Sequence, residues 1–221
     1  MKKGKKVGIL GAGNVGSTIA YTLTANAVAA EIVLIDINKD KAKGEAIDIF
    51  QGTAMAQPVN IYAGDYKDLE GADIVVITSG APRKPGQSRI DLVQGNVNIM
   101  KEIMPQVVKY CPDAVYVVVS NPVDILTYQI ATQFGLHPHQ VIGTGTLLDT
   151  SRLRSIIAKQ LDFNTHSIHA YVLGEHGDTS VIPWSLLTIG GMAVTSYCSI
   201  EKDDKICRAI NYDELEKEVR N

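Results

Sequence analysis

The sequence predicts an α/β fold in which a doubly wound parallel sheet is followed by the start of a second, α+β domain. Two observations lead to this prediction: short apolar runs alternate with segments of helical periodicity, and this alternation loosens after about residue 143. A six-stranded doubly wound domain needs about 145 residues. We therefore expect a complete first domain over residues 1–143 and a partial second domain over residues 144–221.

The elements of the first domain can be read in order along the chain. Five apolar runs rich in β-branched residues are predicted to be its strands: residues 6–10, 31–37, 59–62, 73–78 and 115–120. Helices are expected over residues 14–27, 38–50 and 91–110, where apolar side chains recur every three or four positions. In the second domain we expect a helix over residues 149–161, apolar runs over residues 169–173 and 184–194, and a last helix from about residue 211.

The composition excludes several classes of protein. Hydrophobic residues make up 45% and charged residues 20%, and the net charge of −3 lacks the basic excess of a nucleic-acid binder. No apolar run approaches the length of a membrane span, and the start of the chain does not resemble a secretory signal. Three widely separated cysteines form no CxxC pair, which argues against a disulfide framework or a zinc site. We expect a cytoplasmic protein without nucleic-acid, membrane or metal partners.

A glycine-rich turn links the first predicted strand to the first helix, and its six residues are Gly11-Ala12-Gly13-Asn14-Val15-Gly16. In the Rossmann arrangement, the first glycine permits the tight turn, the second lets a pyrophosphate approach the backbone, and the third lets helix pack on strand. The anion lies at the helix N-terminus. The sequence therefore predicts a dinucleotide site that includes Gly11, Gly13, Asn14, Val15 and Gly16.

Asp36 follows Gly16 by twenty residues, near the end of the second predicted strand. At this place a carboxylate accepts hydrogen bonds from the adenosine ribose and repels a 2′-phosphate, and no arginine follows it. NAD is therefore the expected cofactor, rather than NADP. The alternative is that Asp36 only caps the helix expected over residues 38–50.

Three residues of the second half have the side chains that oxidation of an alcohol needs. His176 stands between two glycines after an apolar run, where its backbone can come close to a ligand. Asp149 and Arg152 lie three residues apart at the start of a predicted helix, and hence on one face. Asp149 could orient the imidazole while Arg152 binds a substrate carboxylate. The alternative is a local ion pair of little energetic consequence.

A loop rich in proline, glycine and arginine follows the fourth predicted strand, over residues 80–89. In a doubly wound sheet, the loop after this strand lies next to the bound cofactor. Arg83 and Arg89 could reach into a site closed by this loop as a lid. The alternative is a basic loop that faces solvent.

Taken together, these features resemble the NAD-dependent lactate and malate dehydrogenase family over essentially the whole chain, through GAGNVG, VVVSNPVDILTY, TGTLLDTSRLR and LGEHGDT. The resemblance implies that His176 is the acid/base of a hydride transfer and that Asp149 is its partner. It also implies that Arg152 binds the substrate carboxylate, that Arg89 polarises the substrate carbonyl, and that Asn121 lies by the nicotinamide and this carbonyl. The substrate would be an L-2-hydroxy acid.

The resemblance favours lactate and pyruvate as the substrate pair. Glu175 stands where the malate enzymes commonly have a second glycine. Arg83, however, stands six residues before Arg89, where in this family glutamine goes with pyruvate and arginine with oxaloacetate. If Arg83 turns into the pocket, pyruvate would leave its guanidinium unpaired. Malate and oxaloacetate are therefore the alternative pair.

The resemblance also implies regulation and assembly. Arg154 and His169 match the positions at which some bacterial members bind fructose 1,6-bisphosphate across subunits, so this activator and a homotetramer are expected. The alternative is that both residues pack locally. Family members are longer than this chain, which is expected to lack a wall of the substrate pocket. A catalytically silent NAD-binding fragment is therefore the hypothesis from a different functional class.

Overall fold

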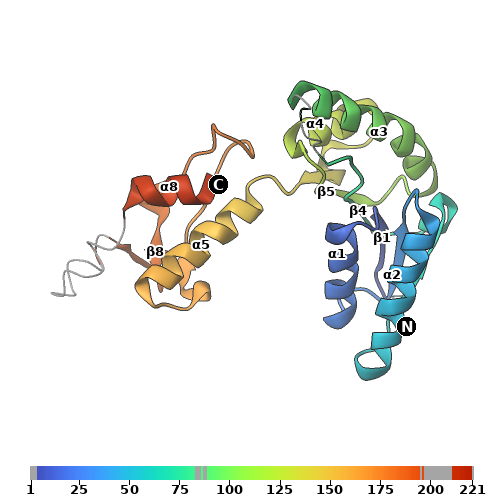
Figure 1. Ribbon diagram of the computed structural model, residues 1–221, viewed down its shortest axis with the longest axis horizontal. Helices are drawn as coiled ribbons and strands as arrows, with labels where there is room; N and C mark the ends of the chain where they lie inside the picture. Colours follow the sequence, from blue (N-terminus) through green and yellow to red (C-terminus); the bar gives the residue numbers. More distant parts are fainter. Residues whose placement is uncertain (1–3, 83–85, 87–88, 195, 197–210, 221) are drawn as a thin grey trace. The chain divides into compact units, whose positions relative to one another are not determined.

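The computed structural model describes residues 4–82, 86, 89–194, 196 and 211–220. It divides into two compact units, Met1–Gly143 and Thr144–Asn221 (Figure 1). The first unit has parallel strands with helices between them, and the second has helices packed on a small antiparallel sheet. The predicted fold class is confirmed.

The first unit is built on a parallel sheet of six strands in the order β3-β2-β1-β4-β5-β6. These strands are β1 (Lys6–Leu10), β2 (Glu31–Ile35), β3 (Asn60–Ala63), β4 (Ile74–Ile77), β5 (Val115–Val118) and β6 (Val141–Gly143). The strand order reverses between β1 and β4, and ligands of doubly wound sheets bind in the crevice at the carboxyl ends of such neighbouring strands. Each of the five predicted runs overlaps one of these strands. Strand β6 was not predicted, because three residues carry too little periodicity.

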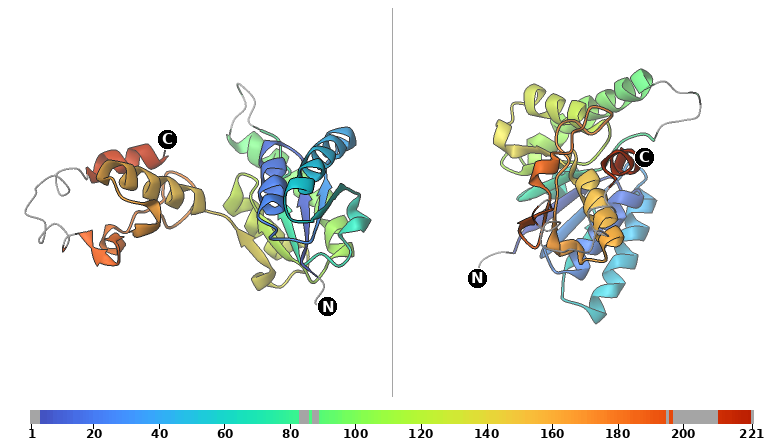
Figure 2. Two further views of the ribbon diagram at one scale, coloured as in Figure 1. Left: turned by 90° about the horizontal axis from the view of Figure 1, so that it is seen from below. Right: turned by 90° about the vertical axis from the view of Figure 1, so that its left-hand side faces the viewer.

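Helices cover both faces of this sheet (Figure 2). They are α1 (Asn14–Ala25), α2 (Lys39–Gly52), α3 (Arg89–Tyr110) and α4 (Val123–Gln133). On one face, α1 and α2 contribute Ala20, Ala46 and Ile49 to a buried apolar cluster. On the other face, α3 and α4 contribute Met104 and Leu126 to a second cluster. Apolar side chains that alternate along each strand supply both clusters, as expected for a sheet buried on two sides.

Several helix boundaries differ from the prediction by one or two residues, and two of the differences have local reasons. Helix α1 ends at Ala25 rather than at residue 27, because Ala27 has a positive φ of 50° that no α-helix accommodates. Helix α2 begins at Lys39, since the side chain of Asn38 accepts the backbone N–H of Lys41 at 3.0 Å and so caps the helix. Helix α4 was not predicted at all.

The second unit packs two helices, α5 (Leu147–Leu161) and α8 (Tyr212–Arg220), with a three-stranded antiparallel sheet. Its strands are β7 (Ile168–His169), β8 (Thr188–Ile189) and β9 (Met192–Ala193). The core of this unit includes Leu153 and Ile157 from α5, and Leu215 and Val219 from α8, all of them buried. The apolar run expected over residues 184–194 is broken by Gly190 and Gly191, whose positive φ values form a two-residue hairpin between β8 and β9.

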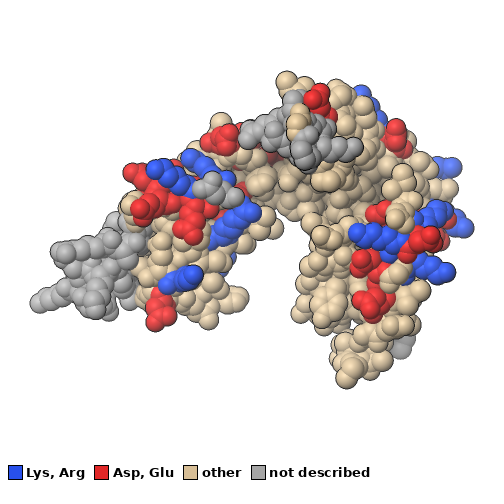
Figure 3. Space-filling view, in the orientation of Figure 1, with Lys and Arg blue, Asp and Glu red and all other residues tan. Residues whose placement is uncertain are grey.

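Charged side chains of both signs are interspersed on the surface of each unit that Figure 3 displays, rather than gathered in a basic stripe. Over the part of the chain that the structure describes, no helix has the length and hydropathy needed to cross a membrane.

Candidate functional site

The glycine-rich turn after β1 has the geometry of a phosphate-binding loop. Gly11 has a positive φ of 104°, and a Cβ on Gly16 would overlap the carbonyl oxygen of Gly11. These two positions therefore require glycine for the turn and for close packing of α1. A Cβ on Gly13 would meet none of the described atoms within 4 Å, so this side of the turn is open. Gly13 is also the N-cap of α1 and supplies no side-chain cap, which leaves N–H groups of Asn14 and Val15 available to an anion.

Asp36 holds the same turn in place from β2. Its Oδ2 atom accepts the backbone N–H of Ala12 at 2.6 Å, and its Oδ1 atom accepts the backbone N–H of Asn38 at 2.8 Å. Since Asn38 is the residue that caps α2, capping does not explain the carboxylate. A carboxylate accepts about four hydrogen bonds. Asp36 therefore retains acceptor capacity for two ribose hydroxyls.

A cavity of about 680 Å³ opens beside this turn, at the carboxyl ends of β1, β4 and β5. It lies where the strand order predicts a ligand site, and its volume suits a small organic ligand. Asp36 borders a neighbouring cavity of about 500 Å³ between α2 and β3. The larger cavity is lined by the residues of the turn and by Thr78, Gly80, Asn96, Ser120 and Asn121, among others.

Asn96 is a buried residue of this cavity that the sequence analysis missed. Its Nδ2 atom donates to the carbonyl oxygen of Asn121 at 2.7 Å, and its Oδ1 atom accepts the backbone N–H of Ala81 at 2.8 Å. One side chain of α3 thereby connects the loop after β4 with the loop after β5. The only signal in the sequence is an amide placed within the apolar pattern of a helix. Asn121 itself is exposed, as a ligand-contacting residue has to be before the ligand binds.

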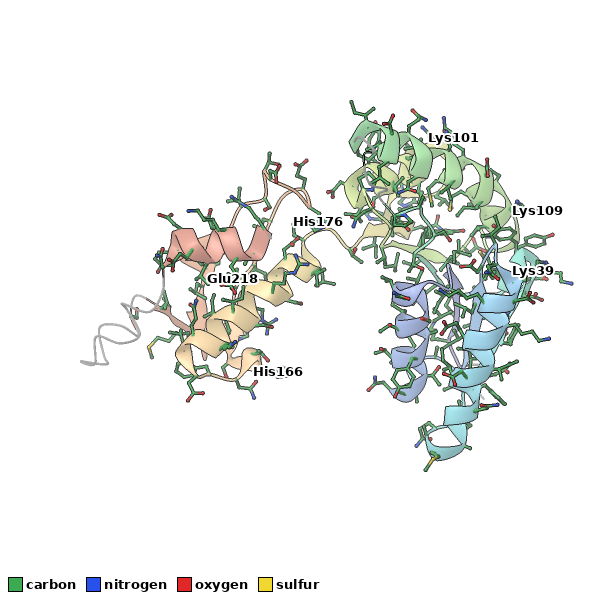
Figure 4. All side chains as sticks on the ribbon, in the orientation of Figure 1. Lys39, Lys101, Lys109, His166, His176 and Glu218 are labelled. Atoms are coloured by element: carbon green, nitrogen blue, oxygen red, sulfur yellow. The ribbon has the colours of Figure 1, made fainter. Side chains whose placement is uncertain are left out.

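The second unit brings His176 and Asp149 together. The imidazole Nδ1 atom lies 2.7 Å from Oδ2 of Asp149, which is buried in the first turn of α5. Figure 4 labels His176 beside the N-terminal end of this helix. Because Nδ1 faces a carboxylate, we assign the proton of the neutral imidazole to Nδ1, so that Nε2 is the nitrogen that accepts a further proton. The arrangement can therefore remove a proton from a bound hydroxyl group.

Arg152 lies on the same face of α5 and makes only a long contact with the aspartate. Its NH1 atom is 3.5 Å from Oδ1 of Asp149, and 43% of its side chain is exposed. A contact of this length is at the limit of hydrogen-bonding distance and is weak. The guanidinium therefore retains donors for a ligand carboxylate.

The loop that carries His176 is joined to α5 by two threonine hydroxyls. Thr146 Oγ1 donates to the carbonyl oxygen of Val172 at 2.6 Å, and the backbone N–H of Val172 donates to Thr150 Oγ1 at 2.9 Å. Leu173 and Val181 form an isolated antiparallel bridge that closes the loop. Neither threonine stood out in the sequence, since helix threonines carry no pattern of their own.

The remaining predicted residues are placed in part. Arg83 lies outside the described residues, and Arg89 is the first residue of α3. Arg154 donates from NH2 to the carbonyl oxygen of Thr165 at 3.1 Å, and its buried Nε atom has no hydrogen-bond partner among the described residues. His169 is exposed in β7. No group of three or more His, Cys, Asp or Glu side chains within the described part of the chain could hold a metal ion.

Comparison with protein families gives two matches that together cover nearly the whole chain. Residues 5–143 match the NAD-binding domain of lactate/malate dehydrogenases, and residues 146–221 match the α/β C-terminal domain of the same enzymes. The first unit is thus an NAD-binding domain, and the geometry of its turn and of Asp36 fits this cofactor.

Individual relatives agree with the family match. The chain is 48% identical over 217 residues to "L-lactate dehydrogenase 1" of Clostridium acetobutylicum, covering 97% of this chain and 69% of the relative. It is 46% identical over 216 residues to an L-lactate dehydrogenase of Thermoanaerobacterium saccharolyticum, covering 98% of this chain and 69% of the relative.

Two solved structures have the same fold. A minor L-lactate dehydrogenase from Enterococcus mundtii has a TM-score of 0.91 at 42% identity, covering all of this chain and 69% of that one. A malate dehydrogenase from Picrophilus torridus has a TM-score of 0.87 at 33% identity, covering 98% of this chain and 66% of that one.

Proposed function

Because the chain belongs to the lactate/malate dehydrogenase family of oxidoreductases, we propose that it is an L-lactate dehydrogenase that acts on the lactate–pyruvate pair. The observation that carries the proposal is the 2.7 Å contact of His176 with Asp149, in a chain that also contains an NAD-binding domain. Curated relatives at 46–48% identity are L-lactate dehydrogenases, which supports lactate as the substrate.

His176 is the proposed acid/base. In the oxidation of lactate, Nε2 removes the hydroxyl proton while the C2–H bond breaks and the C2=O bond of pyruvate forms. Asp149 keeps Nδ1 protonated, orients the ring and stabilises the imidazolium that results. The hydride that leaves C2 would pass to NAD, whose nicotinamide would supply the acceptor when the cofactor is bound. In the reduction of pyruvate, His176 returns the proton to the oxygen.

The other site residues bind and orient. Arg152 holds the substrate carboxylate through paired N–H donors, and Arg89 and Asn121 polarise the carbonyl oxygen. Cofactor binding falls to the turn residues at the N-terminus of α1 and to Asp36, which recognises the ribose. The residues proposed for this role are Gly11, Gly13, Asn14, Val15, Gly16, Asp36 and Asn121.

The second candidate function is malate dehydrogenase. It is favoured by one residue, since Arg83 supplies a cation where a second substrate carboxylate would need one. The third candidate is an NAD-binding chain without turnover; the chain spans 69% of the length of the two curated relatives named above.

Activation by fructose 1,6-bisphosphate within a homotetramer is the regulatory part of the proposal. A guanidinium and an imidazole suit a phosphate group. The Nε atom of Arg154, which is buried and has no partner among the residues that the structure describes, and the exposed ring of His169 are compatible with this role.

The test is NADH oxidation by this chain with equal concentrations of pyruvate or oxaloacetate, each with and without the sugar bisphosphate. NADH binding is followed in parallel by fluorescence. Pyruvate turnover that the bisphosphate increases supports the whole proposal, and a preference for oxaloacetate that Arg83→Gln reverses supports malate dehydrogenase. NADH binding without turnover on either substrate supports the silent chain.

A matched variant tests the acid/base. His176→Gln is expected to lower kcat by at least about 100-fold, because general acid–base catalysis contributes about 10²- to 10⁴-fold. The dissociation constant of NADH is expected to stay unchanged. Wild-type turnover in this variant would contradict the assignment of His176.

A further inference from the structure

Thr146 is the N-cap of α5, yet its side chain does not cap the helix. A threonine at this position ordinarily accepts a backbone N–H of the first turn, which stabilises the helix. Here the hydroxyl of Thr146 instead donates a hydrogen bond to the carbonyl oxygen of Val172, with an O–O distance of 2.6 Å. Because Thr146 forgoes the capping hydrogen bond that its position favours, we infer that its bond to Val172 serves the tertiary structure.

Thr150, one helical turn later, completes the contact with the same residue. Its Oγ1 atom accepts the backbone N–H of Val172 at 2.9 Å. Both backbone polar groups of Val172 are therefore bound by side chains of α5. We call Thr146, Thr150 and the backbone of Val172 the threonine clamp.

The clamp satisfies the backbone groups of Val172, which lies outside strand β7. Strand β7 ends at His169, and the backbone N–H and C=O of Leu173 both pair with Val181. Since backbone groups of successive residues in extended chain point in opposite directions, those of Val172 point away from this bridge. The side chain of Val172 is buried, and unpaired backbone groups beside it would be costly. The two hydroxyls satisfy them.

The clamp lies close in sequence to both members of the His176–Asp149 pair. Asp149 lies on α5 between the two threonines, and His176 follows Val172 by four residues. The residues between Leu173 and Ser180 are exposed. The clamp thus joins the helix that carries the carboxylate to the segment that carries the ring, four residues before His176.

We propose that Thr146 and Thr150 are positioning residues that hold His176 at hydrogen-bonding distance from Asp149. The kinetic part of this inference rests on the proposed function, whereas its geometric part does not. A hydroxyl is the feature required, because serine would preserve both bonds and the isosteric valine would remove them.

The experiment uses Thr146→Val, Thr150→Val and the corresponding serine variants of this chain. NMR of the ¹⁵N-labelled protein follows the Nδ1–H resonance of His176, which the hydrogen bond to Asp149 protects from exchange with water. Amide exchange of Val172 reports on the clamp itself. Asp149→Ala gives the spectrum of an imidazole without its partner, and Thr132→Val is the control, since this hydroxyl bonds only within its own helix α4.

Each valine variant is expected to lose the Nδ1–H resonance and to exchange the Val172 amide at least about tenfold faster, while the serine and Thr132 variants keep wild-type behaviour. In an active chain, kcat falls at least about tenfold, because a misplacement of about 1 Å can cost about 100-fold in rate. The KM of the 2-oxo acid and the affinity for NADH change little.

Valine variants that keep the Nδ1–H resonance and wild-type kcat, and lose only stability to urea, would overturn the proposal. Alanine variants replace any valine variant that does not fold, since alanine has the higher helix propensity. A Val172 amide that exchanges in the wild-type chain as fast as in an unstructured peptide would also overturn it. A wild-type chain without turnover contradicts only the proposed function, because the two NMR readings still decide the clamp.

Discussion

Asp36 is expected to stabilise the first unit even when no cofactor is bound. Its carboxylate accepts the N–H of Ala12, a residue with 0% exposure, at 2.6 Å. In Asp36→Ala this donor is left buried without a partner, which costs about 1.5–3 kcal/mol for a bond to a charged group. The second bond, to the N–H of Asn38, adds little, because Asn38 is exposed and water replaces the carboxylate.

The assay is urea unfolding of the chain without cofactor, followed by a probe in the first unit. A loss of about 2 kcal/mol is roughly a 30-fold change in the folding equilibrium and, at a slope of about 2 kcal/mol per molar urea, lowers the midpoint by about 1 M. Asp40→Ala is the matched control, because this exposed carboxylate in the first turn of α2 contributes only about 0.3–1 kcal/mol. An unchanged midpoint in Asp36→Ala, together with weaker NADH binding, would show that the carboxylate serves the ribose alone and would refute the reasoning.

Further predictions concern backbone space and the core of the second unit. Gly16→Ala is expected to abolish NADH binding and to lower stability, since its Cβ would overlap the carbonyl oxygen of Gly11. Gly44→Ala is the control: this position lies in open space on α2, and the change is expected to stabilise the chain by about 0.4–1 kcal/mol. Calorimetry measures the stability of both variants, and NADH fluorescence measures their affinity for the cofactor. Equal NADH affinity in the two variants would contradict the steric argument. Leu153→Ala is expected to cost about 2–5 kcal/mol in urea unfolding because Leu153 is fully buried, and exposed Leu148→Ala less than about 0.5 kcal/mol. Similar losses would mean that Leu153 does not pack in a core.

Much of the fold could be predicted because its signals are local. Each predicted strand of the first unit is a largely apolar run, and the turn follows from the positive φ of Gly11 and the close packing at Gly16. By contrast, α4 and β6 were missed. Helix α4 is largely apolar without a marked polar face, and β6 has three residues that become a strand only by pairing with β5.

The candidate site likewise combines residues that could be identified from the sequence with residues whose roles depend on tertiary contacts. The proximity of His176 and Asp149, which are 27 residues apart, was implied by the resemblance to a family and not by any spacing. The roles of Thr146, Thr150 and Asn96 could not be predicted, because each depends on a backbone partner brought near by tertiary folding. A side chain of this kind looks like an ordinary polar position of a helix until the partner is known.

The amide of Asn96 has a consequence for how the rim of the cofactor cavity responds to change. It is bound to backbone groups at Ala81 and at Asn121, forty positions apart, and is itself 2% exposed. Displacement of either loop alone would leave the buried amide of Asn96 with an unpaired donor or acceptor, at a cost of about 1–3 kcal/mol. That cost is a coupling free energy, equivalent to about a 5- to 150-fold change in affinity between two contact points. A ligand that engages one loop thereby biases the other before touching it.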